Sequence, residues 1–107
     1  MFTRIVELTT KPGQNEQLSA TINNKVLPIL KRQKGFVDEM VLVSDKEANR
    51  VLGISFWNTK QDAEQYHRAE YGNVQDALRP LLDGEPMIRT FEVHTSTTHK
   101  IATGKAA

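Results

Sequence analysis

The segment that decides the fold is residues 51–71, which read VLGISFWNTKQDAEQYHRAEY. Its first part is an apolar run that ends in Trp57, a pattern that is typical of a buried strand. Thr59 and Asp62 follow at the spacing of a helix start, in which the threonine caps the helix and the aspartate completes a pair resembling a capping box. The segment therefore predicts a strand that ends in a tryptophan and passes directly into a helix.

Three further strands are predicted on either side of this segment. Apolar periodicity indicates strands over residues 2–9, 36–43 and 87–94, in addition to the one over 50–57. Gly53, inside the strand over 50–57, suggests a bulge or a close approach of another backbone.

Two helical regions separate these strands. The first has helical spacing from Asn15 to Gln33, and Pro28 predicts a kink near residues 25–27 because proline removes one helical hydrogen bond. The second begins at Thr59 and is expected to run to about Glu70. Gly72 is expected to interrupt it before a shorter helical piece over 73–82.

The order β-α-β-β-α-β predicts an α+β fold of the ferredoxin-like type, a four-stranded antiparallel sheet with helices on one face. The strand over 36–43 is apolar on both sides. Phe36, Met40 and Leu42 are expected on one face, and valines on the other. Because the helices of one domain cover only one face, we expect a homodimer whose sheets pack face to face. One domain over residues 1–96 is expected, with a polar tail over 97–107 that is frayed or lies on a partner.

Composition excludes several classes of function. The 107 residues carry 14 basic and 13 acidic side chains, so the balance offers no electrostatic footprint for nucleic acid or an acidic membrane. The absence of cysteine excludes disulfides and thiolate chemistry. Neither a phosphate-binding glycine loop nor a signal peptide nor a membrane span is present in the sequence, so a cytoplasmic protein is expected.

Four short motifs carry a resemblance to a known family. These are the turn at residues 11–13 (KPG), the start of the second strand at 35–37 (GFV), the end of the third at 55–57 (SFW) and the helix segment at 62–67 (DAEQYH). In this order and spacing, residues 1 to about 96 resemble the antibiotic biosynthesis monooxygenase (ABM) domain of the dimeric α+β-barrel superfamily. The resemblance implies a homodimer. Some members of the family are oxygenases that need no cofactor and oxidise polycyclic phenols to quinones in a pocket between sheet and helices. The resemblance therefore favours a pocket of this kind in the present chain.

A second branch of the resembling family degrades haem, and this chain does not fit it. The positions that need an asparagine, a tryptophan and a haem-ligating histidine are occupied by Val6, Tyr66 and Asp76. No cofactor is therefore expected. His94 and His99 near the tail have no carboxylate at ligand spacing, so no metal site is expected either.

The candidate catalytic residues are His67 and Tyr66. An unperturbed imidazole titrates near pH ~6.5 and can remove a phenolic proton at neutral pH, which produces an anion that reacts directly with dioxygen. Tyr66 would hold the substrate oxygen or wall the pocket. The alternative for His67 is an unremarkable position at the solvent or dimer edge, since adjacent helical residues point about 100° apart.

The candidate substrate-binding residues are Trp57 as a stacking wall, Asn58, Met40 and Arg89, which would hold an oxyanion. Three of them have a structural alternative: Trp57 seals the core, Asn58 belongs to a turn, and Arg89 forms a salt bridge. Arg4, which shares a face with Phe2, has the same two interpretations as Arg89. Two functions therefore stay open, a monooxygenase acting on a phenolic or quinol-type aromatic, and a non-catalytic dimeric barrel that binds a small apolar ligand.

Overall fold

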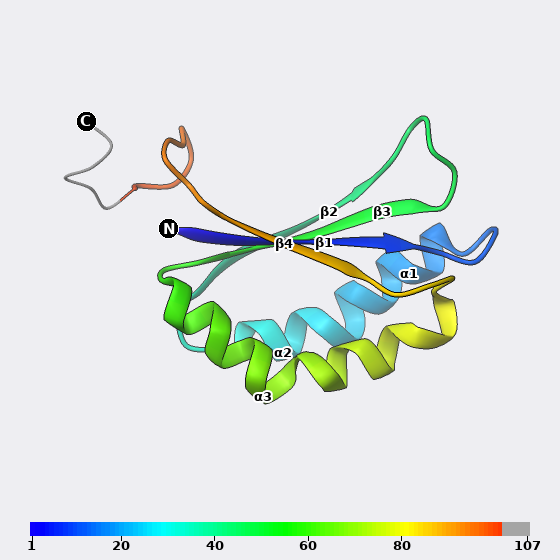
Figure 1. The fold of residues 1–107 in the computed structure, drawn as a ribbon, viewed down its shortest axis with the longest axis horizontal. Helices are drawn as coiled ribbons and strands as arrows, with labels where there is room; N and C mark the ends of the chain where they lie inside the picture. The colour runs from blue at the N-terminus through cyan, green and yellow to red at the C-terminus, as the bar shows by residue number, and fades with distance from the viewer. Residues whose placement is uncertain (102–107) are drawn as a thin grey trace.

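The computed structural model describes residues 1–101 and shows a layer of strands above a layer of helices (Figure 1). The strands form one antiparallel sheet in the order β2-β3-β1-β4. Their bounds are β1 Phe2–Thr9, β2 Phe36–Val43, β3 Arg50–Trp57 and β4 Met87–Glu92. The first three strands match the predicted bounds. β4 is shorter than predicted because its ladder with β1 ends where Glu92 pairs with Phe2, close to the chain start.

The first helical region has three segments, α1 (Asn15–Thr21), the π-helical η1 (Ile22–Val26) and α2 (Leu27–Lys31). The π-helical segment ends two residues before Pro28, and Pro28, which has no N–H to donate to the preceding turn, lies in the first turn of α2. The irregularity predicted from Pro28 is therefore present as a local widening of the helix.

The second helical region corrects a prediction. α3 (Lys60–Leu78) runs without a break through Gly72, and only the short 3-10 helix η2 (Arg79–Leu81) follows at Pro80. Tyr71, Val74 and Leu78 are buried on either side of Gly72. Their packing against the sheet outweighs the roughly 1 kcal/mol that a helical glycine costs. At the start of α3, the Thr59 hydroxyl accepts a hydrogen bond from the Asp62 N–H, as the capping motif predicts.

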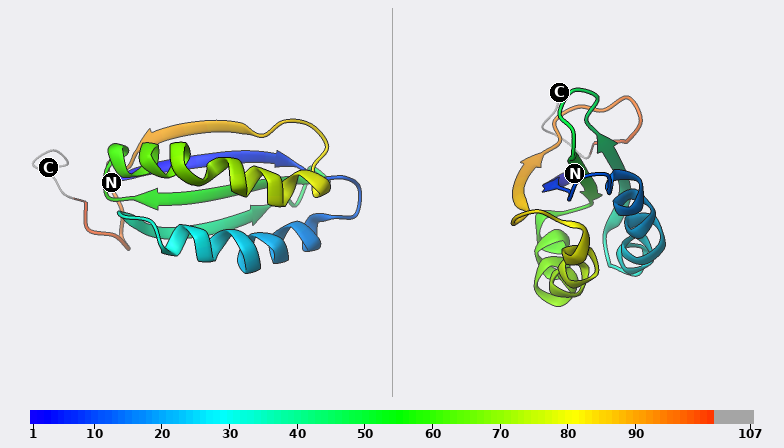
Figure 2. Two further views of the ribbon diagram at one scale, coloured as in Figure 1. Left: turned by 90° about the horizontal axis from the view of Figure 1, so that it is seen from below. Right: turned by 90° about the vertical axis from the view of Figure 1, so that its right-hand side faces the viewer.

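The helices cover one face of the sheet and lie side by side beneath it (Figure 2). The core between the two layers includes Trp57 and Leu18, both fully buried. A bulge between Phe36 and Asp38 shifts the alternation of β2. Phe36 therefore packs against the core beside Trp57, whereas Met40 and Leu42 lie on the other face; the predicted shared face of these three residues is wrong.

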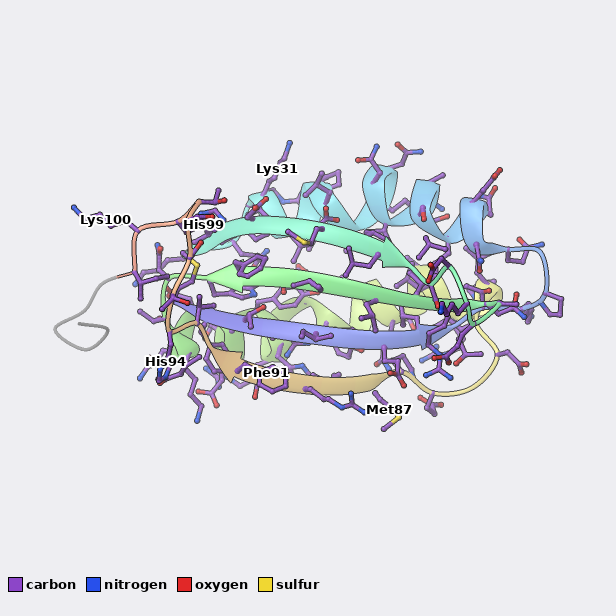
Figure 3. The ribbon with its side chains drawn as sticks, turned by 90° about the horizontal axis from the view of Figure 1, so that it is seen from above. Lys31, Met87, Phe91, His94, His99 and Lys100 are labelled. Atoms are coloured by element: carbon purple, nitrogen blue, oxygen red, sulfur yellow. The ribbon has the colours of Figure 1, made fainter. Side chains whose placement is uncertain are left out.

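The face away from the helices is covered by no helix in the described chain, and much of it is open to solvent (Figure 3). Met40, Leu42, Met87 and Phe91 are each between 41% and 53% exposed there. The segment after β4 returns to this face, where the His99 ring lies 5.7 Å from the Phe56 ring and its Nε2 lies 3.3 Å from a carboxylate oxygen of Asp38. The last part of the predicted tail, 102–107, lies outside the described residues. No helix within residues 1–101 has the length and apolar character needed to cross a membrane.

Candidate functional site

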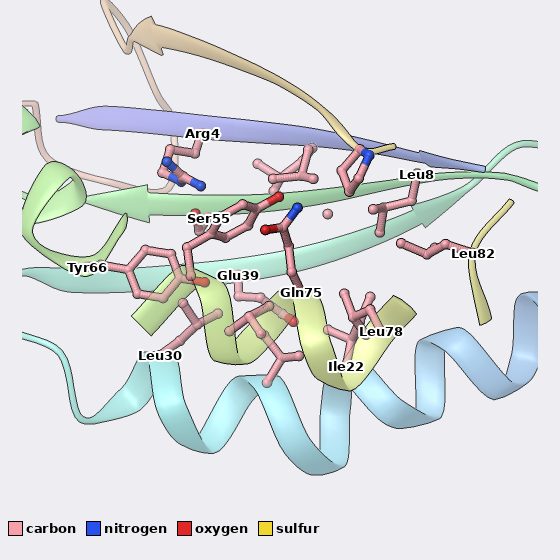
Figure 4. A pocket seen from close by; sticks show the side chains of 17 residues that line it. Arg4, Leu8, Ile22, Leu30, Glu39, Ser55, Tyr66, Gln75, Leu78 and Leu82 are labelled. Atoms are coloured by element: carbon pink, nitrogen blue, oxygen red, sulfur yellow. The ribbon is translucent and has the colours of Figure 1, made fainter. Parts of the chain in front are cut away.

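A cavity lies between the sheet and the helices, at the middle of the molecule (Figure 4). The volume of the cavity is about 60 Å³, which is room for several water molecules. Most of the wall is apolar, with Ile22, Val26 and Leu30 contributed by the first helical region. The polar residues that line the cavity are Arg4, Glu39, Ser55, Tyr66, Tyr71 and Gln75. An apolar cavity with a few polar groups is the usual form of a small-molecule site.

Arg4 on β1 is the charged group at one end of this cavity and is only 5% exposed. Its guanidinium carbon lies 5.5 Å from the ring centre of Tyr66 and 5.1 Å from that of Tyr71, as in cation–π contacts. None of the ion pairs formed within residues 1–101 includes Arg4, and its Nη2 is buried without a hydrogen-bond partner. Burial lowers the pKa of Arg4, but an arginine stays protonated in proteins. A buried cation without an anionic partner has the chemistry to bind an anion.

His67 on α3 is exposed and contacts Arg4 from the side. Nη1 of Arg4 lies 3.2 Å from Nδ1 of His67, and because arginine only donates, Nδ1 must accept. The neutral imidazole therefore carries its proton on Nε2. Burial and the charge of Arg4 lower the pKa of His67, and its ring stacks on Tyr71 at 4.9 Å. The ring lies at the solvent edge, which is the structural alternative expected for His67, and the lone pair that a base would use is already engaged.

Tyr66 and Trp57 stack with ring centres 5.1 Å apart and an angle of 27° between the planes. Trp57 is fully buried and its Nε1–H donates to Ser55 Oγ over 2.9 Å, so it supports Tyr66 from behind and does not line the cavity. Burial raises the pKa of Tyr66 to about 12. Tyr66 is therefore a neutral hydroxyl at the cavity wall, able to donate or accept a hydrogen bond.

Glu39 and Gln75 reach the cavity from opposite layers, and sequence reasoning singled out neither. Glu39 is paired in register with Ser55, which places it on the face of β2 that looks toward the helices. Burial and the neighbouring charge of Asp38 raise the pKa of the Glu39 carboxyl. The available signal was the pair of adjacent carboxylates, Asp38 and Glu39, in the otherwise apolar strand FVDEMVLV.

Like Trp57, the three other predicted substrate-binding residues do not reach the cavity. Arg89 pairs with Ile5, a neighbour of Arg4 that points to the opposite face, and Arg89 is exposed on the uncovered side of the sheet. Met40 lies on that same side because of the bulge in β2. Asn58 is exposed in the turn before α3, where its N–H donates to the Gly35 carbonyl over 2.8 Å. The cation at the cavity is Arg4 instead of Arg89.

A wider groove of about 280 Å³ lies beside the first turns of α3 and is lined by Lys60, Glu64, His67 and Arg68, among others. Arg4 lines both this groove and the cavity, so its guanidinium forms part of the wall between them. Within residues 1–101 there is no group of three or more histidine and acidic side chains that could hold a metal ion.

The comparisons with known proteins agree with this architecture. The family model described as antibiotic biosynthesis monooxygenase matches residues 1–74, and no curated protein matches the chain. A monooxygenase from Streptomyces coelicolor, solved with nanaomycin D, has a TM-score of 0.76 at 17% identity, covering 89% of this chain and 88% of that one. A cofactor-independent oxygenase from Streptomyces nogalater has a TM-score of 0.72 at 18% identity, covering 92% and 97%. A protein of unknown function from Nitrosomonas europaea has a TM-score of 0.74 at 18% identity, covering 96% and 95%. At these identities the likeness shows the fold, and the predicted fold class is confirmed.

Proposed function

The chain belongs to the antibiotic biosynthesis monooxygenase family, and from this premise we propose that it is a cofactor-independent monooxygenase that oxidises a phenolic aromatic compound. Two observations on similar structures support the proposal. One similar structure is that of a cofactor-independent oxygenase, and another is that of a monooxygenase in complex with nanaomycin D. The proposed site is the cavity between sheet and helices.

The observation that carries the proposal is the environment of Arg4. Its buried guanidinium has tyrosine rings around it, an unpaired Nη2 and no anionic partner within the described chain. In an apolar cavity such a cation stabilises a phenolate or enolate much more strongly than water does, because the local dielectric constant is low. Ionisation makes the aromatic ring electron-rich, and an electron-rich anion can react with dioxygen without a metal or a flavin.

The reaction balances without a reductant. In an anthrone-like substrate, a CH₂ group loses one proton to form an enolate whose oxygen is held by Arg4. The carbanion then adds dioxygen to give a peroxide, which loses its remaining C–H proton and a hydroxide. The products are one new carbonyl group and one water. The cavity is smaller than a multi-ring aromatic, so binding requires its lining to move.

We also propose that the protein forms a homodimer. The uncovered face carries Met40, Leu42, Met87 and Phe91, and a second copy of the same face would remove these apolar side chains from water. Dimerisation of this kind leaves the cavity on the helical side of each sheet.

The test of the proposed function is oxygen uptake by the purified, chelator-treated protein with anthrone and with dithranol. We expect one dioxygen consumed per quinone formed, above the rate of the same solution without protein. No uptake, together with thermal stabilisation by the same compounds, would favour the alternative, a non-catalytic barrel that binds an apolar ligand. If the compounds cause no oxygen uptake and no thermal stabilisation, the cavity is rejected as the site.

A further inference from the structure

The oxidation proposed above needs a proton acceptor in the cavity, and the side chain best placed for this is a carboxylate. We propose that Glu39 is the general base of the reaction, an assignment that rests on the proposed function. Glu39 would take the first proton from the substrate, in place of His67.

The position of Glu39 follows from the sheet register. Glu39 pairs with Ser55, and Ser55 lies with Gly53 and Trp57 on the face of β3 that looks toward the helices. Figure 4 shows the side chains of Glu39, Tyr66 and Gln75 around one space, with Arg4 above them on β1.

The other ionisable groups at the cavity are poorly suited to accept a proton. Arg4 is a permanent cation, and burial raises the pKa of Tyr66 and of Tyr71, so both phenols hold their protons at neutral pH. His67 lines the neighbouring groove instead of the cavity, and its unprotonated Nδ1 is engaged by Arg4. Among the residues that line the cavity, Glu39 is the carboxylate.

Arg4 and Glu39 line the same cavity, yet none of the ion pairs formed within residues 1–101 joins them. A cation and a carboxylate that remain apart can act on one substrate at two points. The oxygen of the substrate would lie at Arg4, and the acidic C–H or O–H would face Glu39. A direct ion pair would instead neutralise both groups.

Glu39 alone can carry out every proton transfer of the proposed reaction. The carboxylate takes a proton from the CH₂ group of an anthrone, and Arg4 holds the enolate oxygen. After dioxygen adds to the carbanion, the carboxylic acid returns that proton to the peroxide. The regenerated carboxylate then removes the second C–H proton as hydroxide leaves, and the hydroxide receives this proton to become water.

The surroundings of Glu39 favour proton uptake. Burial raises the pKa of the carboxyl first, and the charge of Asp38 on the same strand raises it further. The other polar groups that line the cavity are Arg4 on β1, whose positive charge does not favour proton uptake, Ser55 on β3, and Tyr66, Tyr71 and Gln75 on α3. The side chains of the first helical region at the cavity are apolar.

The experiment compares Glu39→Gln and Glu39→Ala with the wild type, using anthrone and oxygen uptake. We expect both variants to keep anthrone-dependent thermal stabilisation and to lose about 10²–10⁴-fold in kcat, the usual contribution of a general base. Added formate should restore part of the turnover of Glu39→Ala and leave Glu39→Gln unchanged. The matched control is Glu16→Gln, the same change at an exposed position in the first turn of α1, which should keep wild-type turnover.

The outcomes separate the two proposals. A wild type that consumes no oxygen with anthrone or dithranol rejects the proposed function, and the role of Glu39 with it. An active wild type whose kcat is unchanged in Glu39→Gln rejects the role of Glu39 and leaves the oxygenase proposal standing. A loss of turnover in both variants without rescue of Glu39→Ala by formate would assign Glu39 a structural role instead.

Discussion

Nη1 of Arg4 donates a hydrogen bond to Nδ1 of His67 across 3.2 Å, and this contact joins residues that are 63 positions apart in the chain. It fixes the tautomer of the imidazole and holds the guanidinium beside the rings of Tyr66 and Tyr71. His67 therefore acts on the cavity through Arg4, as a positioning residue.

Replacing His67 by Phe tests that role. Phenylalanine keeps a ring that can stack on Tyr71 but removes the acceptor for Arg4. A hydrogen bond to a charged group contributes about 1.5–3 kcal/mol, so we expect kcat/KM for anthrone to fall by roughly ten- to hundredfold with turnover retained. Steady-state oxygen uptake measures this change. A complete loss of activity in His67→Phe, with full activity in Glu39→Gln, would make His67 the base.

The lowered pKa of His67 has a consequence for stability. Because the folded protein holds this histidine neutral below the ordinary pKa of 6.5, the unfolded chain binds more protons near pH 6. The stabilisation is complete above pH 6.5 and is lost as the pH falls toward the lower folded value. We expect the melting temperature of the wild type to drop more between pH 7.5 and 5.5 than that of His67→Phe. The difference should be small since the ring is exposed, and parallel curves would show that the contact with Arg4 does not form in solution.

Gly53 leaves the cavity open where a side chain would fill it. A Cβ added at Gly53 would meet no atom within 4 Å, and the residue lines the cavity. Gly53→Ala should therefore keep the melting temperature or raise it, but should weaken stabilisation by anthrone. Gly72→Ala is the matched control, because its Cβ also meets nothing while the position lies outside the cavity. That variant should gain about 0.5–1 kcal/mol in unfolding free energy and keep ligand binding. Equal ligand responses in the two variants, measured by thermal shift, would place the ligand elsewhere.

The uncovered face of the sheet is expected to form the homodimer. Leu42→Lys puts a charge on that face, where Leu42 is 45% exposed, and should yield folded monomers in sedimentation experiments. Val43→Lys is the control: Val43 is 47% exposed but pairs with fully buried Val51 at the end of the helical face, so this variant should stay dimeric. A wild type that sediments as a monomer contradicts the proposed interface.

Local pattern was sufficient for most of the fold. The strands Phe2–Thr9, Phe36–Val43 and Arg50–Trp57 were predictable because apolar residues with turn signals on both sides determine a strand with little help from the rest of the chain. The unbroken path of α3 through Gly72 and the bulge in β2 were not, since both depend on packing between distant elements.

The site was predictable only in part, for the same reason. Trp57 and Tyr66 are nine positions apart across a strand–helix junction, and their contact follows from local geometry. The choice between Arg4 and Arg89 as the cation requires knowing which face of the edge strand β4 meets the helices. That depends on the register of β4 against β1, which the alternation within one strand cannot supply.

The central claim is that Arg4 stabilises a phenolate inside the cavity, and the most direct test is the absorbance of bound 4-nitrophenol as a function of pH. In the wild type, we expect the bound phenol to ionise at a lower pH than the free compound. In Arg4→Met this shift should disappear while the melting temperature is kept, since replacing a buried unpaired charge by an apolar side chain is often neutral or stabilising. Bound nitrophenol that ionises at the same pH as the free compound, or at a higher one, in the wild type would contradict the account.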